Sequence, residues 1–149
     1  MDKKDELRLG FETAYIDGNV ASNVVYRPQF LSNNYKEGKK VLSSVEDELL
    51  SCDKFQISVA FITLGGIEQK NIPGEILTTN YLNFSEPKAL AKLNVLKNIK
   101  LKMYDVEKAS EGFHTKGYIF KKEEIYRIII GSSNMTKSAL TTNREWNTK

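Results

Sequence analysis

The alternation of strand-like and helix-like segments is the feature that most constrains this chain. Runs rich in β-branched and aromatic residues, which favour strands, span 55–62, 74–79, 99–104, 113–121 and 125–131. Helix-like patterns, in which apolar residues recur every three to four positions, span 3–16, 39–52, 87–98 and the short stretch 137–140. Ser85 is a possible cap ahead of Pro87 at the start of the third helix. This alternation predicts an α/β layered domain.

Size and composition fit one globular unit. The chain has 149 residues, of which 40% are hydrophobic and 28% charged, and its formal net charge is +3. These values exclude collagen-like and low-complexity classes, and the slight basic excess is compatible with a phosphate-bearing partner. We expect residues 1–54 to form a helical and loop extension that packs on a core of residues 55–149. Because Trp146 lies so close to the end, we also expect the fold to continue beyond Lys149.

Cysteine content and hydropathy indicate in which cellular compartment the protein works. Cys52 is the single cysteine, which excludes an internal disulfide and a multi-cysteine zinc site. No run approaches the ~20 apolar residues that a membrane helix needs. The charged N-terminus is not followed by the apolar run of a secretory signal, so we expect a reducing, cytoplasmic compartment without membrane association.

A polar cluster is predicted where two strands meet. His114 and Lys116 are two residues apart in the strand 113–121 and would project to the same face. A turn centred between positions 122 and 123 would pair His114 with Gly131 and Lys116 with Ile129, bringing Ser132 and Asn134 beside the imidazole. Such donors suit an oxyanion such as phosphate. The alternative is a surface His–Lys pair and an ordinary turn that leads into a helix cap.

These residues resemble a known signature. His114-x-Lys116, followed by Gly131-Ser132-x-Asn134 and then Glu145, is similar to the motif of the phospholipase D superfamily, including its nuclease and tyrosyl-DNA phosphodiesterase branches. The segments 26–28, 60–63 and 142–147 resemble the N-terminal phospholipase D-like domain of bacterial superfamily 2 helicase or restriction-type proteins. The resemblance implies a mixed β-sheet flanked by helices, with helicase domains downstream in the full-length chain.

The resemblance also implies a mechanism. His114 would attack phosphorus and form a phosphohistidine. Lys116 and Asn134 would bind the non-bridging oxygens, assisted by Ser132, and Glu145 would accept a hydrogen bond from the other ring nitrogen. No metal and no cofactor are implied.

The histidine count predicts an assembly. The superfamily uses a second histidine as general acid, and this chain has one histidine. We therefore expect a homodimer with a composite site. DNA is the preferred substrate, with further phosphate contacts from lysines at 36, 39, 40, 121, 122 and 137. Phospholipid is disfavoured because no amphipathic membrane-binding stretch accompanies the site.

Two departures from the superfamily keep other functions open. Lys121 stands where the superfamily has an aspartate, and the connection after Leu64 is short for a crossover between parallel strands. The alternatives are a catalytically weak or inactive DNA-binding module and a plain dimerisation domain.

Overall fold

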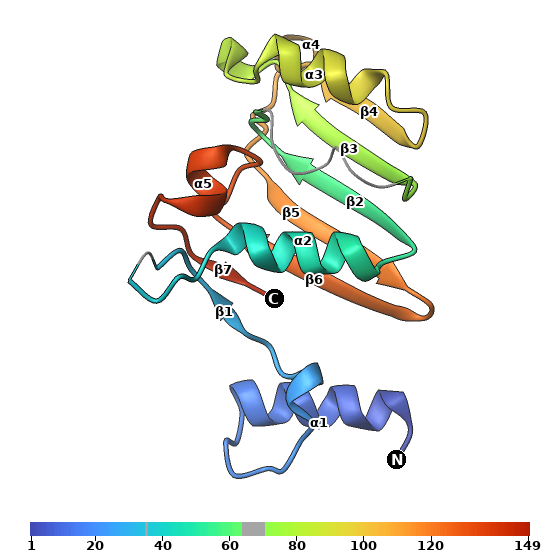
Figure 1. Ribbon diagram of the computed structural model, residues 1–149, viewed down its shortest axis with the longest axis vertical. Helices are drawn as coiled ribbons and strands as arrows, with labels where there is room; N and C mark the ends of the chain where they lie inside the picture. The colour runs from blue at the N-terminus through green and yellow to red at the C-terminus, as the bar shows by residue number, and fades with distance from the viewer. Residues whose placement is uncertain (35, 64–70) are drawn as a thin grey trace.

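The sheet determines where every functional segment lies. The computed structural model describes residues 1–34, 36–63 and 71–149, and within these ranges a seven-stranded sheet has the order β1-β7-β6-β5-β2-β3-β4 (Figure 1). The strands are β1 (Phe30–Leu31), β2 (Lys54–Val59), β3 (Gly74–Thr79), β4 (Ile99–Tyr104), β5 (Lys116–Lys122), β6 (Ile125–Gly131) and β7 (Asn147–Thr148). β2, β3 and β4 run parallel, whereas β5, β6, β7 and β1 pair antiparallel, so the predicted mixed sheet is confirmed.

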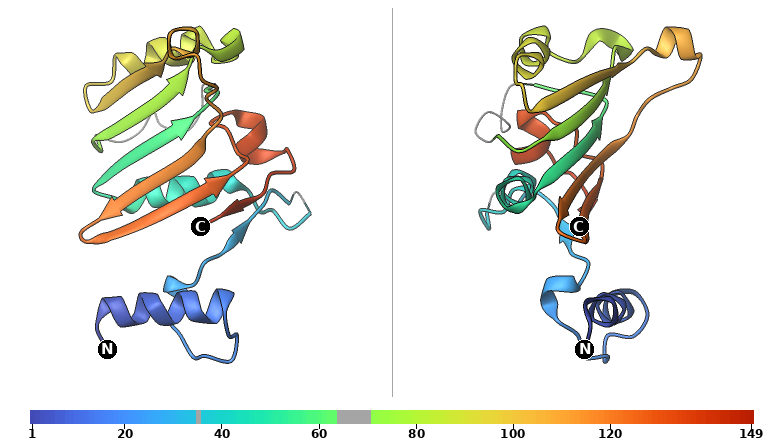
Figure 2. Two further views of the ribbon diagram at one scale, coloured as in Figure 1. Left: turned by 180° about the vertical axis from the view of Figure 1, so that it is seen from behind. Right: turned by 90° about the vertical axis from the view of Figure 1, so that its right-hand side faces the viewer.

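Helices cover one face of this sheet. The helical segments are α1 (Lys3–Tyr15), η1 (Val24–Tyr26), α2 (Val41–Ser51), η2 (Tyr81–Asn83), α3 (Pro87–Asn94), α4 (Val106–Ala109) and α5 (Lys137–Thr141). In the right-hand view of Figure 2, α2, α3 and α5 lie on the same side of the strands. The α/β class predicted from the alternating pattern is therefore confirmed.

The core lies between the sheet and these helices. Alternate side chains of β2 and β5 point inward, as the two-residue period of a strand requires. They pack against the apolar stripe of α2, which recurs at helical spacing. The buried residues of these three elements are Val41, Val45, Leu49, Phe55, Ile57, Val59, Tyr118 and Phe120. This packing therefore fixes where the ends of β2 and β5 lie.

Some predicted boundaries differ from the structure. The strand predicted over 55–62 ends at Val59, and the helix predicted over 87–98 ends at Asn94. Ser85 is not the cap of that helix, because Glu86 occupies the N-cap position. The Ser85 hydroxyl is instead buried and accepts from the Ile62 amide over 3.3 Å, where it satisfies a backbone donor at the end of β2.

The register of the β5–β6 hairpin also differs from the prediction. Lys122 pairs with Ile125, and Gly117 pairs with Ile130, so the turn is centred between residues 123 and 124. The predicted pairs of His114 with Gly131 and of Lys116 with Ile129 are wrong, and His114 lies just before β5 rather than within it. The Glu123 amide donates to the Asp53 carboxylate over 2.7 Å, which favours this turn. The slip is two residues, so the inward face predicted for each side chain is unchanged.

The N-terminal helix lies apart from the core. α1 packs against η1, and Figure 1 shows it beyond the edge of the sheet, tied to the hairpin by the ion pair of Lys3 with Glu123 at 3.2 Å. Its aromatic residues Phe11 and Tyr15 are exposed and line an open groove. α2, by contrast, belongs to the core.

The connection between β2 and β3 cannot be compared with its prediction, because residues 64–70 lie outside the described residues. This range includes Gly65 and Gly66, the predicted end of the strand, and the short segment after Leu64. Within the described parts of the chain, no helix combines the length and the apolar character that crossing a membrane requires.

Candidate active site

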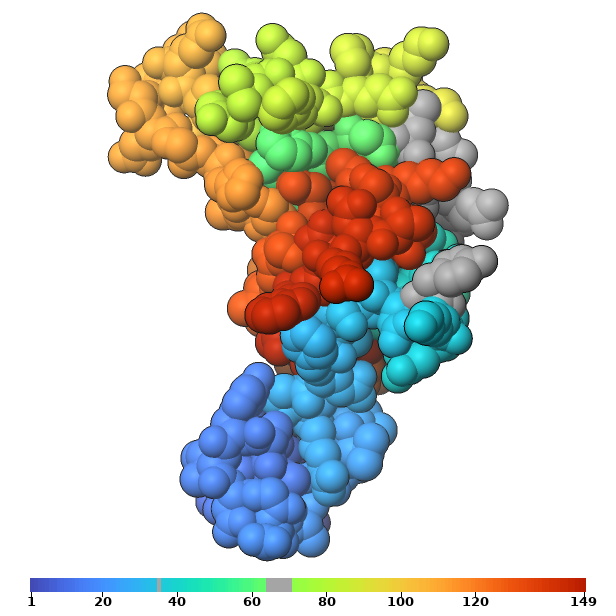
Figure 3. Space-filling view, turned by 90° about the vertical axis from the view of Figure 1, so that its left-hand side faces the viewer, coloured from blue at the N-terminus to red at the C-terminus, as the bar shows by residue number. Residues whose placement is uncertain are grey.

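The sequence-predicted site residues come from three segments that meet at one end of the sheet. His114 and Lys116 lie where the chain enters β5, Ser132 and Asn134 lie in the turn that leaves β6, and Glu145 lies just before β7. Figure 3 views this end, where residues 131–148 (red) lie next to the segment that leads into β5 (orange). The structure therefore brings together the segments that the sequence pattern singled out.

Lys116 contacts the imidazole directly. Its Nζ lies 2.8 Å from Nδ1 of His114 and donates to the His114 carbonyl oxygen over 3.0 Å. His114 is exposed, whereas Lys116 is partly buried. Burial lowers the pKa of Lys116, and the nearby Glu145 carboxylate acts in the opposite direction by stabilising the ammonium. The Lys116 ammonium therefore interacts with both the His114 imidazole, by direct contact, and the Glu145 carboxylate, through its charge.

Ser132 holds the Glu145 carboxylate. The Ser132 hydroxyl donates to a Glu145 carboxylate oxygen and accepts from the Trp146 amide over 3.0 Å. The Ser132 amide in turn donates to the Trp146 carbonyl over 3.0 Å. In this arrangement Glu145 is engaged by Ser132, while the predicted partner, the imidazole of His114, contacts Lys116 through Nδ1.

Asn134 is attached to the end of β2. The Phe61 amide donates to Asn134 Oδ1 over 3.1 Å, which identifies that atom as the carbonyl oxygen, because an amide N–H needs an acceptor. The Met135 amide donates to the Phe61 carbonyl over 3.1 Å, and the Thr63 amide donates to the Met135 carbonyl over 2.9 Å. With its oxygen engaged, the Asn134 carboxamide offers its NH₂ group as a donor to an anion.

Buried hydrogen bonds hold the turn that follows β6, at Ser133. Tyr118 donates from its hydroxyl to the Ser133 carbonyl over 3.0 Å, and Asn147 donates from Nδ2 to Ser133 Oγ over 2.9 Å. Burial raises the pKa of the Tyr118 phenol, and the charge of Glu145 adds to this effect, so the hydroxyl remains a donor. Sequence reasoning missed Ser133, Asn147 and Tyr118 as supporting residues, because only the folded chain shows that they are buried together.

Phe61 links Asn134 to His114. The Phe61 ring centroid is 6.4 Å from that of His114 and 5.1 Å from that of Phe84, edge to face in both cases. Phe61 was not predicted as a site residue. Its signal in the sequence is that it lies in the segment 60–63, which resembles the phospholipase D-like domain.

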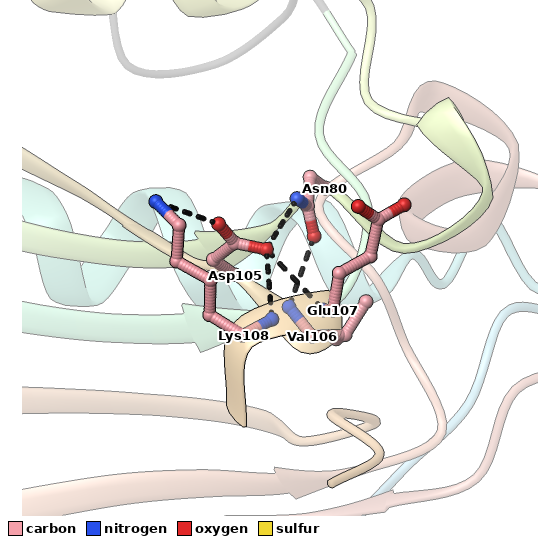
Figure 4. A network of polar contacts seen from close by, with 5 residues as sticks. All are labelled: Asn80, Asp105, Val106, Glu107 and Lys108. Atoms are coloured by element: carbon pink, nitrogen blue, oxygen red, sulfur yellow. Dashed lines mark hydrogen bonds and ion pairs between the residues drawn. The ribbon is translucent and has the colours of Figure 1, made fainter. Parts of the chain in front are cut away.

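The segment between β4 and β5, which carries His114, is held by hydrogen bonds where it leaves β4. As Figure 4 shows, Asn80 Nδ2 donates to Asp105 Oδ1 over 3.1 Å, and the Val106 amide donates to Asn80 Oδ1 over 3.1 Å. The hydrogen bond from Asn80 and those from Lys108 lower the pKa of Asp105. Asp105 also caps α4 by accepting from the amides of Glu107 and Lys108 (Figure 4). This network joins the ends of β3 and β4 and sets the start of the loop to His114.

Other predicted residues lie away from the site. Lys121 and Lys122 are at the far end of β5, where the Lys121 ammonium lies 5.6 Å from the centre of the Tyr126 ring. Lys39 forms an ion pair with Glu37 at 2.6 Å. Within the described residues, no group of three or more His, Cys, Asp or Glu side chains is arranged to hold a metal ion.

Solved structures with this fold include a phospholipase D family member and a tyrosyl-DNA phosphodiesterase. NucT from Helicobacter pylori matches with a TM-score of 0.61 at 18% identity, covering 82% of this chain and 83% of that one. Nuc from Salmonella typhimurium, a phospholipase D family member, matches with a TM-score of 0.56 at 20% identity, covering 82% of each chain. Yeast tyrosyl-DNA phosphodiesterase matches with a TM-score of 0.56 at 14% identity, covering 81% of this chain and 31% of that one. At these identities the likeness establishes the fold.

Sequence comparison supplies the family. No curated protein matches the chain. The family model described as the PLD-like domain of cardiolipin synthase matches residues 43–149, which begin within α2 and include every predicted site residue. Since the match covers most of the chain and the sheet agrees with the solved relatives, this protein belongs to the phospholipase D-like family.

Proposed function

We propose that this chain is a metal-independent phosphodiesterase that cleaves DNA through a phosphohistidine formed on His114. The observation that carries the proposal is the contact of the Lys116 ammonium with the His114 imidazole at 2.8 Å, with the Asn134 carboxamide linked to that imidazole through Phe61. In this proposal His114 is the nucleophile, and the Lys116 ammonium and the Asn134 carboxamide are the donors for two non-bridging oxygens. The names of two solved relatives, a phospholipase D family member and a tyrosyl-DNA phosphodiesterase, support this choice of chemistry.

In this proposal the contact between Lys116 and His114 sets the resting tautomer of the imidazole. An ammonium only donates, so Nδ1 carries a lone pair there and the ring proton is on Nε2. Attack through Nε2 requires the proton to be on Nδ1 instead. We expect an incoming phosphate to draw Lys116 onto a non-bridging oxygen, after which Glu145 accepts from Nδ1–H of the imidazole. Lys116 thereby supplies the charge that a metal ion provides in other phosphodiesterases.

The reaction then has two displacements. The imidazole nitrogen bonds to phosphorus as the bond to the leaving oxygen breaks, and that oxygen takes a proton from a general acid. Water then attacks phosphorus, the nitrogen–phosphorus bond breaks, and the proton of the water passes to the conjugate base of that acid. Since His114 is the single histidine of the chain, the acid in this proposal is His114 of a second copy in a two-fold dimer.

The second candidate is a catalytically weak or inactive DNA-binding or dimerisation module of a helicase or restriction system. Lys121, in the place of the superfamily aspartate, favours it, and the structure puts this lysine at the far end of β5 from His114. In both candidates we propose helicase domains in the full-length protein, on the basis of the sequence resemblance.

A trapping experiment separates the two candidates. The wild-type chain is incubated with 5′- and 3′-labelled DNA in EDTA, denatured at alkaline pH, and measured by intact-protein mass spectrometry. We expect cleavage together with a phosphohistidine adduct that is lost in acid and absent from His114→Ala. Lys4→Ala, which changes an exposed lysine of α1, is the control and should cleave normally. DNA binding without cleavage or adduct would establish the second candidate, and an absolute requirement for Mg²⁺ would contradict the metal-independent mechanism.

A further inference from the structure

The backbone on both sides of His114 is held in place. Phe113, before it, stacks on Tyr104 of β4 with 5.2 Å between the ring centroids. Thr115, after it, hydrogen-bonds through its hydroxyl to the hydroxyl of Ser58 in β2 over 2.6 Å. These contacts fix where the Cα atom of His114 lies, so the direction of its imidazole depends on the side-chain torsions alone.

Within the described part of the chain, two contacts restrict those torsions. Lys116 Nζ lies 2.8 Å from Nδ1, and the Phe61 ring lies edge to face with the imidazole, with 6.4 Å between centroids. Aromatic pairs at such distances favour a defined arrangement. In the proposed mechanism Nδ1 passes from Lys116 to Glu145 as the phosphate arrives. During this exchange Phe61 is the contact that keeps the exposed imidazole in place.

The position of Phe61 is itself fixed by hydrogen bonds. Its amide donates to Asn134 Oδ1 over 3.1 Å. The buried Ser85 hydroxyl bonds to both neighbours of Phe61, since it accepts from the Ile62 amide over 3.3 Å and donates to the Ala60 carbonyl over 3.5 Å. A shift of Phe61 would break hydrogen bonds of buried groups, which is costly.

Phe84 supports the Phe61 ring. The two rings pack edge to face, with 5.1 Å between their centroids. Phe84 directly precedes Ser85, so the hydroxyl that holds the backbone around Phe61 also determines where Phe84 lies. Among the described residues, the ring contact of Phe84 is with Phe61 and not with His114. An effect of Phe84 on the imidazole must therefore pass through Phe61.

We propose that Phe61 is the positioning residue of the nucleophile and that Phe84 acts through it. The Phe61 ring sets the orientation in which the imidazole meets phosphorus, and the Phe61 amide orients the Asn134 carboxamide toward a non-bridging oxygen. One residue thereby fixes the nucleophile relative to an oxyanion donor. The inference rests on the proposed function, because it takes His114 as the nucleophile and Asn134 as a phosphate donor.

The first test does not depend on cleavage. His114 is the single histidine, so its carbon-bound ring protons give one set of NMR signals in the full chain. The ring current of Phe61 should displace these signals from those of the urea-unfolded chain. Phe61→Leu keeps the backbone amide and should move them toward the unfolded position, whereas Phe61→Tyr should retain the wild-type shift. Phe11→Leu, which removes an exposed ring of α1, is the control and should leave them unchanged.

DNA cleavage measures the same contact during the reaction. Phe61→Leu should lower kcat about tenfold or more with little change in KM, because the ring orients the nucleophile and does not bind the substrate. Phe61→Tyr should retain most of the wild-type kcat. Phe84→Leu should lower kcat less, and the double variant Phe61→Leu/Phe84→Leu should be no slower than Phe61→Leu alone.

The outcomes are distinct. Unchanged histidine signals in Phe61→Leu would overturn the proposal, and so would losses in kcat that add in the double variant. Phe84 is 58% exposed, so Phe84→Leu should fold even where Phe61→Leu does not. It should then move the His114 signals in the same direction, and unchanged signals would again contradict the proposal. A wild-type chain that does not cleave DNA would refute the proposed function, while the NMR signals still decide whether Phe61 orients the imidazole.

Discussion

The buried side chain of Asn147 forms two hydrogen bonds to one residue, Ser133. Its Nδ2 donates to Ser133 Oγ over 2.9 Å, and its Oδ1 accepts from the Ser133 amide over 3.3 Å. Ser133 lies between Ser132 and Asn134, which are both proposed phosphate-binding residues. The first residue of β7 therefore holds the turn that carries the site, although Asn147 itself has no role in the proposed chemistry.

Replacing Asn147 by Ala should destabilise the protein. The change leaves the buried Ser133 amide and hydroxyl without these partners, which costs about 1–3 kcal/mol of unfolding free energy. Urea denaturation measures this loss. Asn94→Ala, at the exposed end of α3, is the control and should lie within about 0.5 kcal/mol of wild type. A loss no larger than that of the control would show that the turn does not depend on Asn147.

Gly131 allows β6 and β7 to approach closely. A Cβ at this position would overlap the Trp146 carbonyl oxygen and the backbone of Asn147. Gly131→Ala should therefore displace β7, lower the unfolding free energy by about 1–3 kcal/mol and reduce cleavage, because Glu145 and Ser132 shift with the strand. Gly117→Ala in β5 is the matched control, since its Cβ would lie 3.9 Å from Ile130, an ordinary contact. Thermal unfolding and DNA cleavage measure both effects, and equal behaviour of the two variants would contradict this account.

The pH dependence of cleavage should report on Lys116. Burial lowers the pKa of Lys116, so its ammonium loses a proton at a lower pH than an ordinary lysine, whose pKa is about 10.4. Because the proposed mechanism needs the charged form, kcat/KM should fall on the alkaline side below that ordinary value. Lys116→Arg keeps the charge at every accessible pH, so its residual activity should lack this fall. The same alkaline fall in both proteins would assign the titration to another group.

A composite site can be recognised by mixing subunits. If each site needs His114 from both copies, a dimer of wild type with His114→Ala is inactive. After subunit exchange at equal amounts, activity per wild-type chain should drop to about half, because random pairing places half of the wild-type chains in mixed dimers. Activity that stays proportional to the wild-type concentration would show that one chain is sufficient for catalysis. Lys4→Ala in place of His114→Ala should leave activity per wild-type chain unchanged.

Much of the fold could be predicted from local pattern. The stripe of Val41, Val45 and Leu49 determines the inward face of α2, and the alternation in Phe55-Gln56-Ile57 does the same for β2. Such periods are properties of neighbouring residues, so they can be read without the rest of the chain. The hairpin register could not be predicted from the turn alone, because the distant Asp53 bonds the Glu123 amide.

The candidate site was likewise predictable from the sequence in part. The sequence by itself determined which groups are available: strand spacing, which is local, pointed to His114, Lys116, Ser132 and Asn134, and the resemblance to the phospholipase D superfamily added Glu145. Only the tertiary structure decided their partners. Lys116 contacts the imidazole, Ser132 holds the Glu145 carboxylate, and Phe61 joins Asn134 to His114. These contacts join β2, β5, β6 and the segment before β7, and their distances exist only once burial of the shared core has brought the strands together.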